Sequence, residues 1–202
     1  MTESNDALRS LPLLSSIRGL QHPRTDLRCV LEQLAEILDK DRSWSRAEIF
    51  RAGEMLLRWR ESASRRGLWD APPVMMTTTL DDAIGQGLQI IHLFGNLAGL
   101  DVRPLGLMQS PEAIIAACRQ ARPEMLGLTV LQFHSEEILC EIADQLRPAT
   151  RVIAGGPIFK SMAPQALEGK GYLVLNHIRH FIDFLLRFPH ADYPGRQDQT
   201  LL

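Results

Sequence analysis

The sequence predicts an α/β fold in which a five-stranded parallel sheet carries helices on both faces and follows a small helical cap. Two observations lead to this fold class. From residue 74 onward, short apolar stretches alternate five times with helical patterns of roughly 10 to 15 residues, which is typical of parallel βαβ units with right-handed crossovers. The first, third and fourth stretches show little polar alternation, as expected for strands that are covered on both faces.

Composition favours a soluble globular protein. The chain has 202 residues, 45% of them hydrophobic, and a formal net charge of −2, so nothing indicates nucleic-acid binding. No apolar run approaches the ~20 residues that span a bilayer, and the polar start MTESNDALRS lacks the apolar core of a signal peptide, so a cytoplasmic location is expected. Three cysteines, far apart in sequence, predict reduced thiols rather than a zinc site: Cys29, Cys118 and Cys140.

Two amphipathic helices are predicted before the sheet. Residues 1–24 contain several helix breakers and are expected to form a flexible segment. In the cap, residues 25–70, the first helix has one apolar face, and Ser45 with Glu48 forms a capping box that starts the second. These faces must be buried against each other, the following domain or another chain, so a homo-oligomer through these helices is a possibility.

The α/β domain is predicted over residues 72–188 and is followed by a flexible tail, residues 189–202. Its strands are expected at Val74–Thr78, Asp101–Leu105, Met125–Leu131, Thr150–Ala154 and Tyr172–Leu175. Its helices are expected at Gly85–Ala98, Ser110–Ala121, Ser135–Leu146, Ala163–Leu167 and Ile178–Phe188.

Ligands of such a sheet bind outside the carboxyl ends of the strands. Three stretches arrive there, residues 80–85, 129–134 and 155–160. The first leads from a strand through a glycine-containing loop into a helix, which is typical of the opening unit of a cofactor-binding domain. It lacks the G-x-G-x-x-G spacing, so a dinucleotide is not indicated. Asp81 and Asp82 both suit a loop or a helix N-terminus better than a catalytic pair.

These three stretches carry motifs in a familiar order. Ile84 and Gly85 match the end of a D-x-H-x-x-G loop, Thr129-Val130-Leu131 matches S-x-L, and Gly155-Gly156 matches a G-G pair. Residues 72–188 therefore resemble the cobalamin (vitamin B12)-binding domain of corrinoid-dependent methyltransferases, mutases and B12 photoreceptors, which is flavodoxin-like (Rossmann-like). The resemblance implies that the nucleotide tail of the cofactor lies beside the sheet, where a hydroxyl group bonds its base and the glycines leave room.

The sequence departs from the family at the cobalt ligand. Leu80 stands where the family has Asp, and Asp82 stands where it has the cobalt-ligating His. Three alternatives follow: a corrin bound with its own base or without a protein ligand, a different tetrapyrrole such as haem, or a domain that has lost its ligand. His134, which follows the S-x-L-like segment, is the candidate metal ligand, and Asp82 remains a candidate cofactor contact.

The resemblance also suggests a role for the cap, because in the family the preceding helices cover the upper face of the corrin. Trp59 or Trp69 could do so here. The leading hypothesis is a cobalamin- or haem-binding sensor, not an enzyme, that acts through a protein partner such as a transcription regulator. The alternatives are a corrinoid carrier subunit of a methyltransferase system and a ligand-free interaction domain.

Overall fold

The computed structural model describes residues 11–18, 20, 22, 25–41, 43–81, 86–132, 135–160 and 170–189. The backbone divides into two compact units. The helical unit takes in the described residues up to Pro72, then Ile90–Leu100, and then the chain from Ile178. The sheet unit takes in Pro73–Gln89 and Asp101–His177, so the chain passes between the units more than once.

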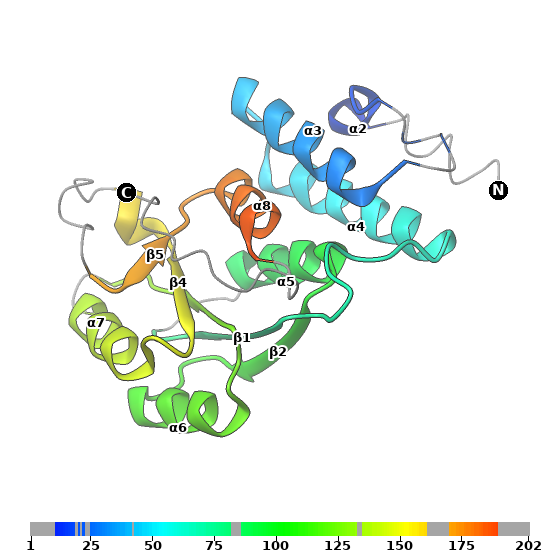
Figure 1. The fold of residues 1–202 in the computed structure, drawn as a ribbon. Coiled ribbons are helices and arrows are strands. Elements are labelled where there is room, and N and C mark those ends of the chain that lie inside the picture. The colour runs from blue at the N-terminus through cyan, green and yellow to red at the C-terminus, as the bar shows by residue number, and fades with distance from the viewer. Residues whose placement is uncertain are drawn as a thin grey trace. The chain divides into compact units, whose positions relative to one another are not determined.

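The sheet unit contains five parallel strands in the order β2-β1-β3-β4-β5, which is the flavodoxin-like order (Figure 1). The predicted fold class is therefore confirmed. The strands are β1 (Val74–Thr79), β2 (Asp101–Gly106), β3 (Met125–Thr129), β4 (Arg151–Gly155) and β5 (Tyr172–Val174).

Two helices lie on the same side of this sheet (Figure 1): α6 (Pro111–Ala121) and α7 (Ser135–Leu146). Ser110 caps α6 by accepting a hydrogen bond from the Ala113 N–H, and Pro111 occupies the first helical position, as predicted. Alternate residues of the central strands meet these helices in one apolar core, which includes Leu126, Leu128, Ile142, Val152 and Ala154.

The observed β3 is shorter than the predicted strand. It ends at Thr129 rather than Leu131, and the Leu131 N–H donates to the Asp81 carboxylate instead of to a neighbouring strand. A 3-10 helix, η1 (Pro157–Lys160), follows β4. The short helix predicted at 163–167 lies outside the described residues.

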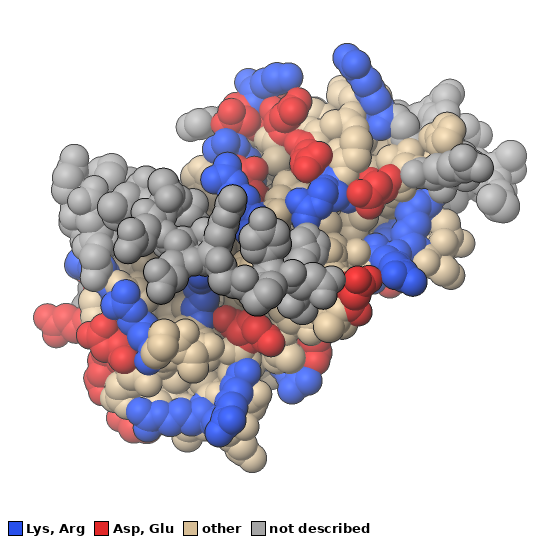
Figure 2. All heavy atoms as spheres, viewed as in Figure 1, with Lys and Arg blue, Asp and Glu red and all other residues tan. Residues whose placement is uncertain are grey.

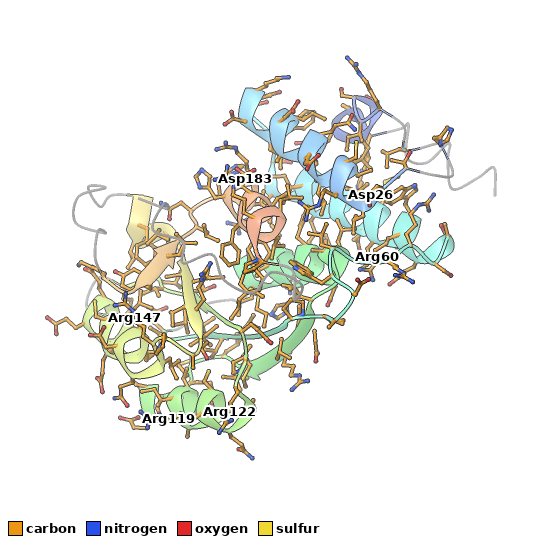
Figure 3. The ribbon with its side chains drawn as sticks, in the orientation of Figure 1. Asp26, Arg60, Arg119, Arg122, Arg147 and Asp183 are labelled. Atoms are coloured by element: carbon orange, nitrogen blue, oxygen red, sulfur yellow. The ribbon has the colours of Figure 1, made fainter. Side chains whose placement is uncertain are left out.

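The helical unit gathers helices from both ends of the chain. They are α2 (Pro12–Ser15), α3 (Leu27–Lys40), α4 (Arg46–Ser62), most of α5 (Gln86–Ala98) and α8 (Ile178–Arg187). Asp26, labelled in Figure 3, caps α3 by accepting a hydrogen bond from the Arg28 N–H. The predicted capping box of Ser45 and Glu48 is present at the start of α4. Residues 11–18, within the segment expected to be flexible, form α2 and bury Leu13 and Leu14.

Helices α5 and α8 pack with the cap helices within this unit. Arg28 Nη1 donates to the Leu186 carbonyl at 2.8 Å, which ties α3 to the last turn of α8. Arg60, labelled in Figure 3, donates from α4 to the carbonyls of Asn96 and Leu97 at the end of α5, at 2.7 and 3.0 Å. The apolar faces of α3 and α4 are thus buried within the chain.

The face shown in Figure 2 carries no strong excess of one charge among the described residues. Acidic and basic side chains are interspersed over the face shown in Figure 2. In the part of the chain that the structure describes, no helix combines the length and apolar character needed to cross a bilayer.

Candidate cofactor-binding site

The strand order places the natural ligand crevice between the ends of β1 and β3. The chain leaves β1 toward β2 on one side of it and returns to β3 on the other, so the order reverses there. In open parallel sheets, ligands bind outside the carboxyl ends of the strands at such a point. The last residues of the two strands, Thr79 and Thr129, are paired directly. The predicted stretches after β1, β3 and β4 therefore reach one edge of the sheet.

Asp81 organises this edge. Its side chain is buried, and its carboxylate accepts hydrogen bonds from the N–H of Leu131 at 2.9 Å, the N–H of Gln132 at 2.9 Å and the Ser135 hydroxyl at 3.1 Å. The carboxylate thus ties the loop after β1 to the loop after β3 and to the start of α7. Its oxygens are occupied by these donors, so Asp81 acts as a positioning residue.

Thr129 offers a hydroxyl group to this edge. It is the last residue of β3 and is half-buried, and its hydroxyl has no hydrogen-bond partner among the described residues. Its carbonyl accepts a 3.4 Å hydrogen bond from the Leu80 N–H. Leu131, two residues further on, is also half-buried. The position and exposure of Thr129 suit a side chain that bonds a ligand.

The two glycines after β4 differ in what a side chain at their position would meet. Gly156 has a φ of +140°, and a Cβ atom there would lie 1.9 Å from the Val130 carbonyl oxygen, so only glycine fits. A Cβ atom on Gly155 would lie 3.1 Å from the Leu175 carbonyl oxygen, which is closer than most Cβ contacts. Gly156 lets the chain pass close to β3, and Gly155 lets it pass close to the residue that follows β5.

Several predicted site residues lie outside the described part of the chain: Asp82, Ile84, Gly85 and His134. Their roles stay predictions, including that of His134 as a metal ligand. Within the described ranges, no cluster of three or more His, Cys, Asp or Glu side chains could hold a metal ion. In the described part of this edge, the Thr129 hydroxyl is the group that is offered to a ligand.

The two predicted tryptophans pack inside the helical unit. Trp59 is 3% exposed, donates from Nε1 to the Leu20 carbonyl at 2.9 Å and carries the Arg65 guanidinium 4.1 Å above its ring. Trp69 is 6% exposed and meets the Phe188 ring edge-on, with 6.2 Å between ring centroids. A contact of either ring with a cofactor stays a prediction, and it would require these neighbours to move.

A loop that sequence reasoning did not single out is bound to the end of β1. The Thr78 hydroxyl donates to the Gly106 carbonyl at 2.8 Å, and the Met108 N–H donates to the Thr79 hydroxyl oxygen at 2.9 Å. Both threonines are buried. Consecutive threonines at the end of an apolar strand were the available signal, because buried hydroxyl groups need partners.

The fold and this edge define a class: a flavodoxin-like α/β domain with a cofactor site at the carboxyl ends of its strands. The family model described as the B12 binding domain matches residues 72–176, more than half of the chain. The protein belongs to this B12-binding domain family, as the sequence resemblance predicted.

Solved structures share the fold. A cobalamin-binding protein from Desulfitobacterium hafniense DCB-2 is similar with a TM-score of 0.66 and 15% sequence identity, covering 92% of this chain and 96% of that one. A chain of the methanol:cobalamin methyltransferase complex MtaBC from Methanosarcina barkeri is similar with a TM-score of 0.54 and 14% identity, covering 92% of this chain and 79% of that one. Comparison with curated protein sequences gives no match.

Proposed function

We propose that this protein binds cobalamin and carries it as the corrinoid subunit of a methyltransferase system. The observation that carries the proposal is the half-buried Thr129 hydroxyl at the end of β3, beside the point where the strand order reverses. That arrangement suits the nucleotide tail, in a chain whose family binds B12. The tail would lie past Gly155, with its base within reach of Thr129.

The likeness to known structures favours the carrier over the sensor hypothesis. It extends over 92% of the chain, and so beyond the family domain, in both a cobalamin-binding protein and a chain of a methyltransferase complex. A methyltransferase is therefore the protein partner we propose. Haem has less support, because the matching family model is described as a B12 binding domain and the similar structures are described as cobalamin proteins.

Cobalamin supplies the chemistry, since its cobalt accepts and gives up a methyl group. The chain's own residues hold the cofactor and set its orientation. Asp81 fixes the two loops that flank the crevice, and Gly156 brings the chain after β4 against Val130. His134 stays the predicted metal ligand, and Asp82 stays a predicted contact of the cofactor.

The test is retention of cobalamin. Purified protein is incubated with hydroxocobalamin or, separately, with haemin, then desalted, and its absorption spectrum is recorded. We expect cobalamin alone to be retained, and Thr129→Trp to abolish retention because the indole fills the tail groove. Gln120→Trp, at an exposed position of α6, is the matched control and should retain cobalamin as the wild type does.

Failure would take two distinguishable forms. Cobalamin retained by Thr129→Trp would contradict the tail groove, and no retention by the wild type would contradict cobalamin binding itself. Illumination of protein loaded with methylcobalamin separates carrier from sensor. If the protein is a carrier, illumination should change only the absorption spectrum of the bound corrinoid. A light-induced change of oligomeric state on size-exclusion chromatography would favour the sensor hypothesis.

A further inference from the structure

Two large apolar side chains stand out at the ligand edge. Leu107 is 49% exposed and Met108 is 60% exposed, and they are the large hydrophobic residues that remain exposed in the described part of the chain. They directly follow β2, so they lie at the carboxyl ends of the strands. Isolated exposed apolar residues are common, but an adjacent pair at a ligand edge calls for an explanation.

The pair is held in place by the end of β1. Met108 has a φ of +54°, in the left-handed region that residues with a Cβ atom rarely adopt, and Gly106 before it has a φ of +103°. The Thr79 hydroxyl oxygen accepts from the Met108 N–H at 2.9 Å, and the Thr79 carbonyl accepts from the Gln109 N–H at 3.1 Å. Strained backbone that the surrounding structure fixes in this way is concentrated at functional sites.

The same threonine connects this loop with the crevice. Thr79, which anchors Met108, is the direct partner of Thr129 across β1 and β3. Neighbouring strands lie about 4.8 Å apart, so the end of β2 is about one and a half strand spacings, or about 7 Å, from the reversal point between β1 and β3. A corrin macrocycle with its side groups is wider than about three such spacings. A macrocycle centred over the crevice therefore extends over the loop after β2.

We propose that Leu107 and Met108 form an apolar seat for the rim of the corrin macrocycle. The proposal rests on cobalamin binding as proposed above and adds residues that bind the ring rather than the tail. The rim carries methyl groups, which an apolar pair contacts well, and the flexible thioether of Met108 adapts to an irregular rim. A protein partner explains the pair less well, because two side chains supply only a small part of the roughly 1,000 Å² that a specific protein interface buries.

The experiment compares two corrinoids. Affinity for cobalamin and for cobinamide, which lacks the nucleotide tail, is measured for the wild type and for Leu107→Ser with Met108→Ser. We expect the double variant to bind both corrinoids at least about tenfold more weakly, because it loses apolar contact with the ring they share. Thr129→Trp should instead lose cobalamin and keep cobinamide, since only the tail meets Thr129.

A second variant separates the side chain from the backbone strain. Met108→Gly suits the left-handed conformation, so its melting temperature should equal or exceed that of the wild type while its affinity for both corrinoids falls. Met108→Leu keeps the apolar surface and should bind both corrinoids as the wild type does.

The possible failures are distinct. If the wild type binds cobalamin and the double variant binds each corrinoid with the affinity of the wild type, the apolar seat is overturned and cobalamin binding stands. If that variant binds both corrinoids normally but no longer binds a partner methyltransferase, Leu107 and Met108 belong to a protein interface. That result also overturns the seat. If the wild type binds neither corrinoid, the proposed function itself fails.

Discussion

At the residue scale, Asp81 is the side chain whose loss should matter most. Asp81→Ala leaves two partly buried backbone N–H groups and a buried serine hydroxyl without their acceptor. An unsatisfied buried donor costs about 1–3 kcal/mol and a partly buried one less, so we expect the free energy of unfolding to fall by about 2–3 kcal/mol. Asp81→Asn keeps one acceptor oxygen and should lose less. Urea unfolding followed by circular dichroism measures both changes.

Ser135→Ala is the matched control for Asp81. It removes one of the same hydrogen bonds and leaves the backbone donors of Leu131 and Gln132 paired. We expect a loss of about 1 kcal/mol. Equal losses for Ser135→Ala and Asp81→Ala would show that the backbone bonds contribute nothing and that Asp81 does not organise the edge.

Local motifs at the site could be read from the sequence, but the contacts that explain them could not. Thr129, Gly155 and Gly156 were found by the order of short motifs. Position 156 requires glycine because the carbonyl of Val130, which directly follows β3, lies so close to it. The Asp81 carboxylate accepts hydrogen bonds from residues 50 and 51 positions further along the chain. Such partners are set by strand order and register, which a local pattern does not contain.

At the element scale, the capping box of α4 shows what local sequence does determine. The Ser45 hydroxyl oxygen accepts from the Glu48 N–H at 3.2 Å, and the Ser45 N–H donates to the Glu48 carboxylate at 2.8 Å. All partners lie within four residues, so the motif could be recognised before the structure was known. Ser45→Ala should lower the melting temperature by about 2–4 °C at neutral pH. Ser16→Ala, at an exposed position after α2, should leave it unchanged.

The effect of Ser45→Ala should depend on pH. Hydrogen bonds from the Ser45 side chain and backbone lower the pKa of Glu48 below its usual value of 4.5. Since the folded-state pKa is the lower one, the stabilisation is present above the unfolded value and is lost as pH falls through the folded value. The gap in melting temperature between the wild type and Ser45→Ala should therefore narrow below about pH 4.5. A gap that stays constant down to pH 3 would rule out the Glu48 carboxylate as the partner.

The positions of helices and strands could be predicted from the periodicity of apolar residues. The elements against which some helices pack could not. Alternation of strands and helices predicted α5 and α8 as parts of the α/β domain. By their contacts, most of α5 and all of α8 group with the helical unit, where Gly53 of α4 admits the close approach of Leu93 and Phe94. An apolar helical face shows that a helix must be covered, and it does not identify the partner.

At the scale of the whole molecule, the helical unit joins the two ends of the chain. Helix α3 packs against α8, and Arg179 of α8 forms an ion pair with Asp39 of α3 at 3.3 Å. The N-terminal helices therefore depend on a segment that lies far away in the sequence. A defect in α8 should act on α3, more than 130 residues earlier, before it acts on the sheet unit.

Phe181→Ala tests this dependence, because Phe181 of α8 is 1% exposed. Truncating a buried phenylalanine costs about 3–5 kcal/mol, which should speed hydrogen exchange of the α3 amides by two or more orders of magnitude. Amides of β1 and β3 in the sheet unit should keep their protection, and the exposed Arg187→Ala should leave both regions unchanged. Equal loss of protection in α3 and in the strands would show instead that the two units open as one cooperative structure, and then cobalamin binding at the sheet edge should protect the α3 amides as strongly as those of β3.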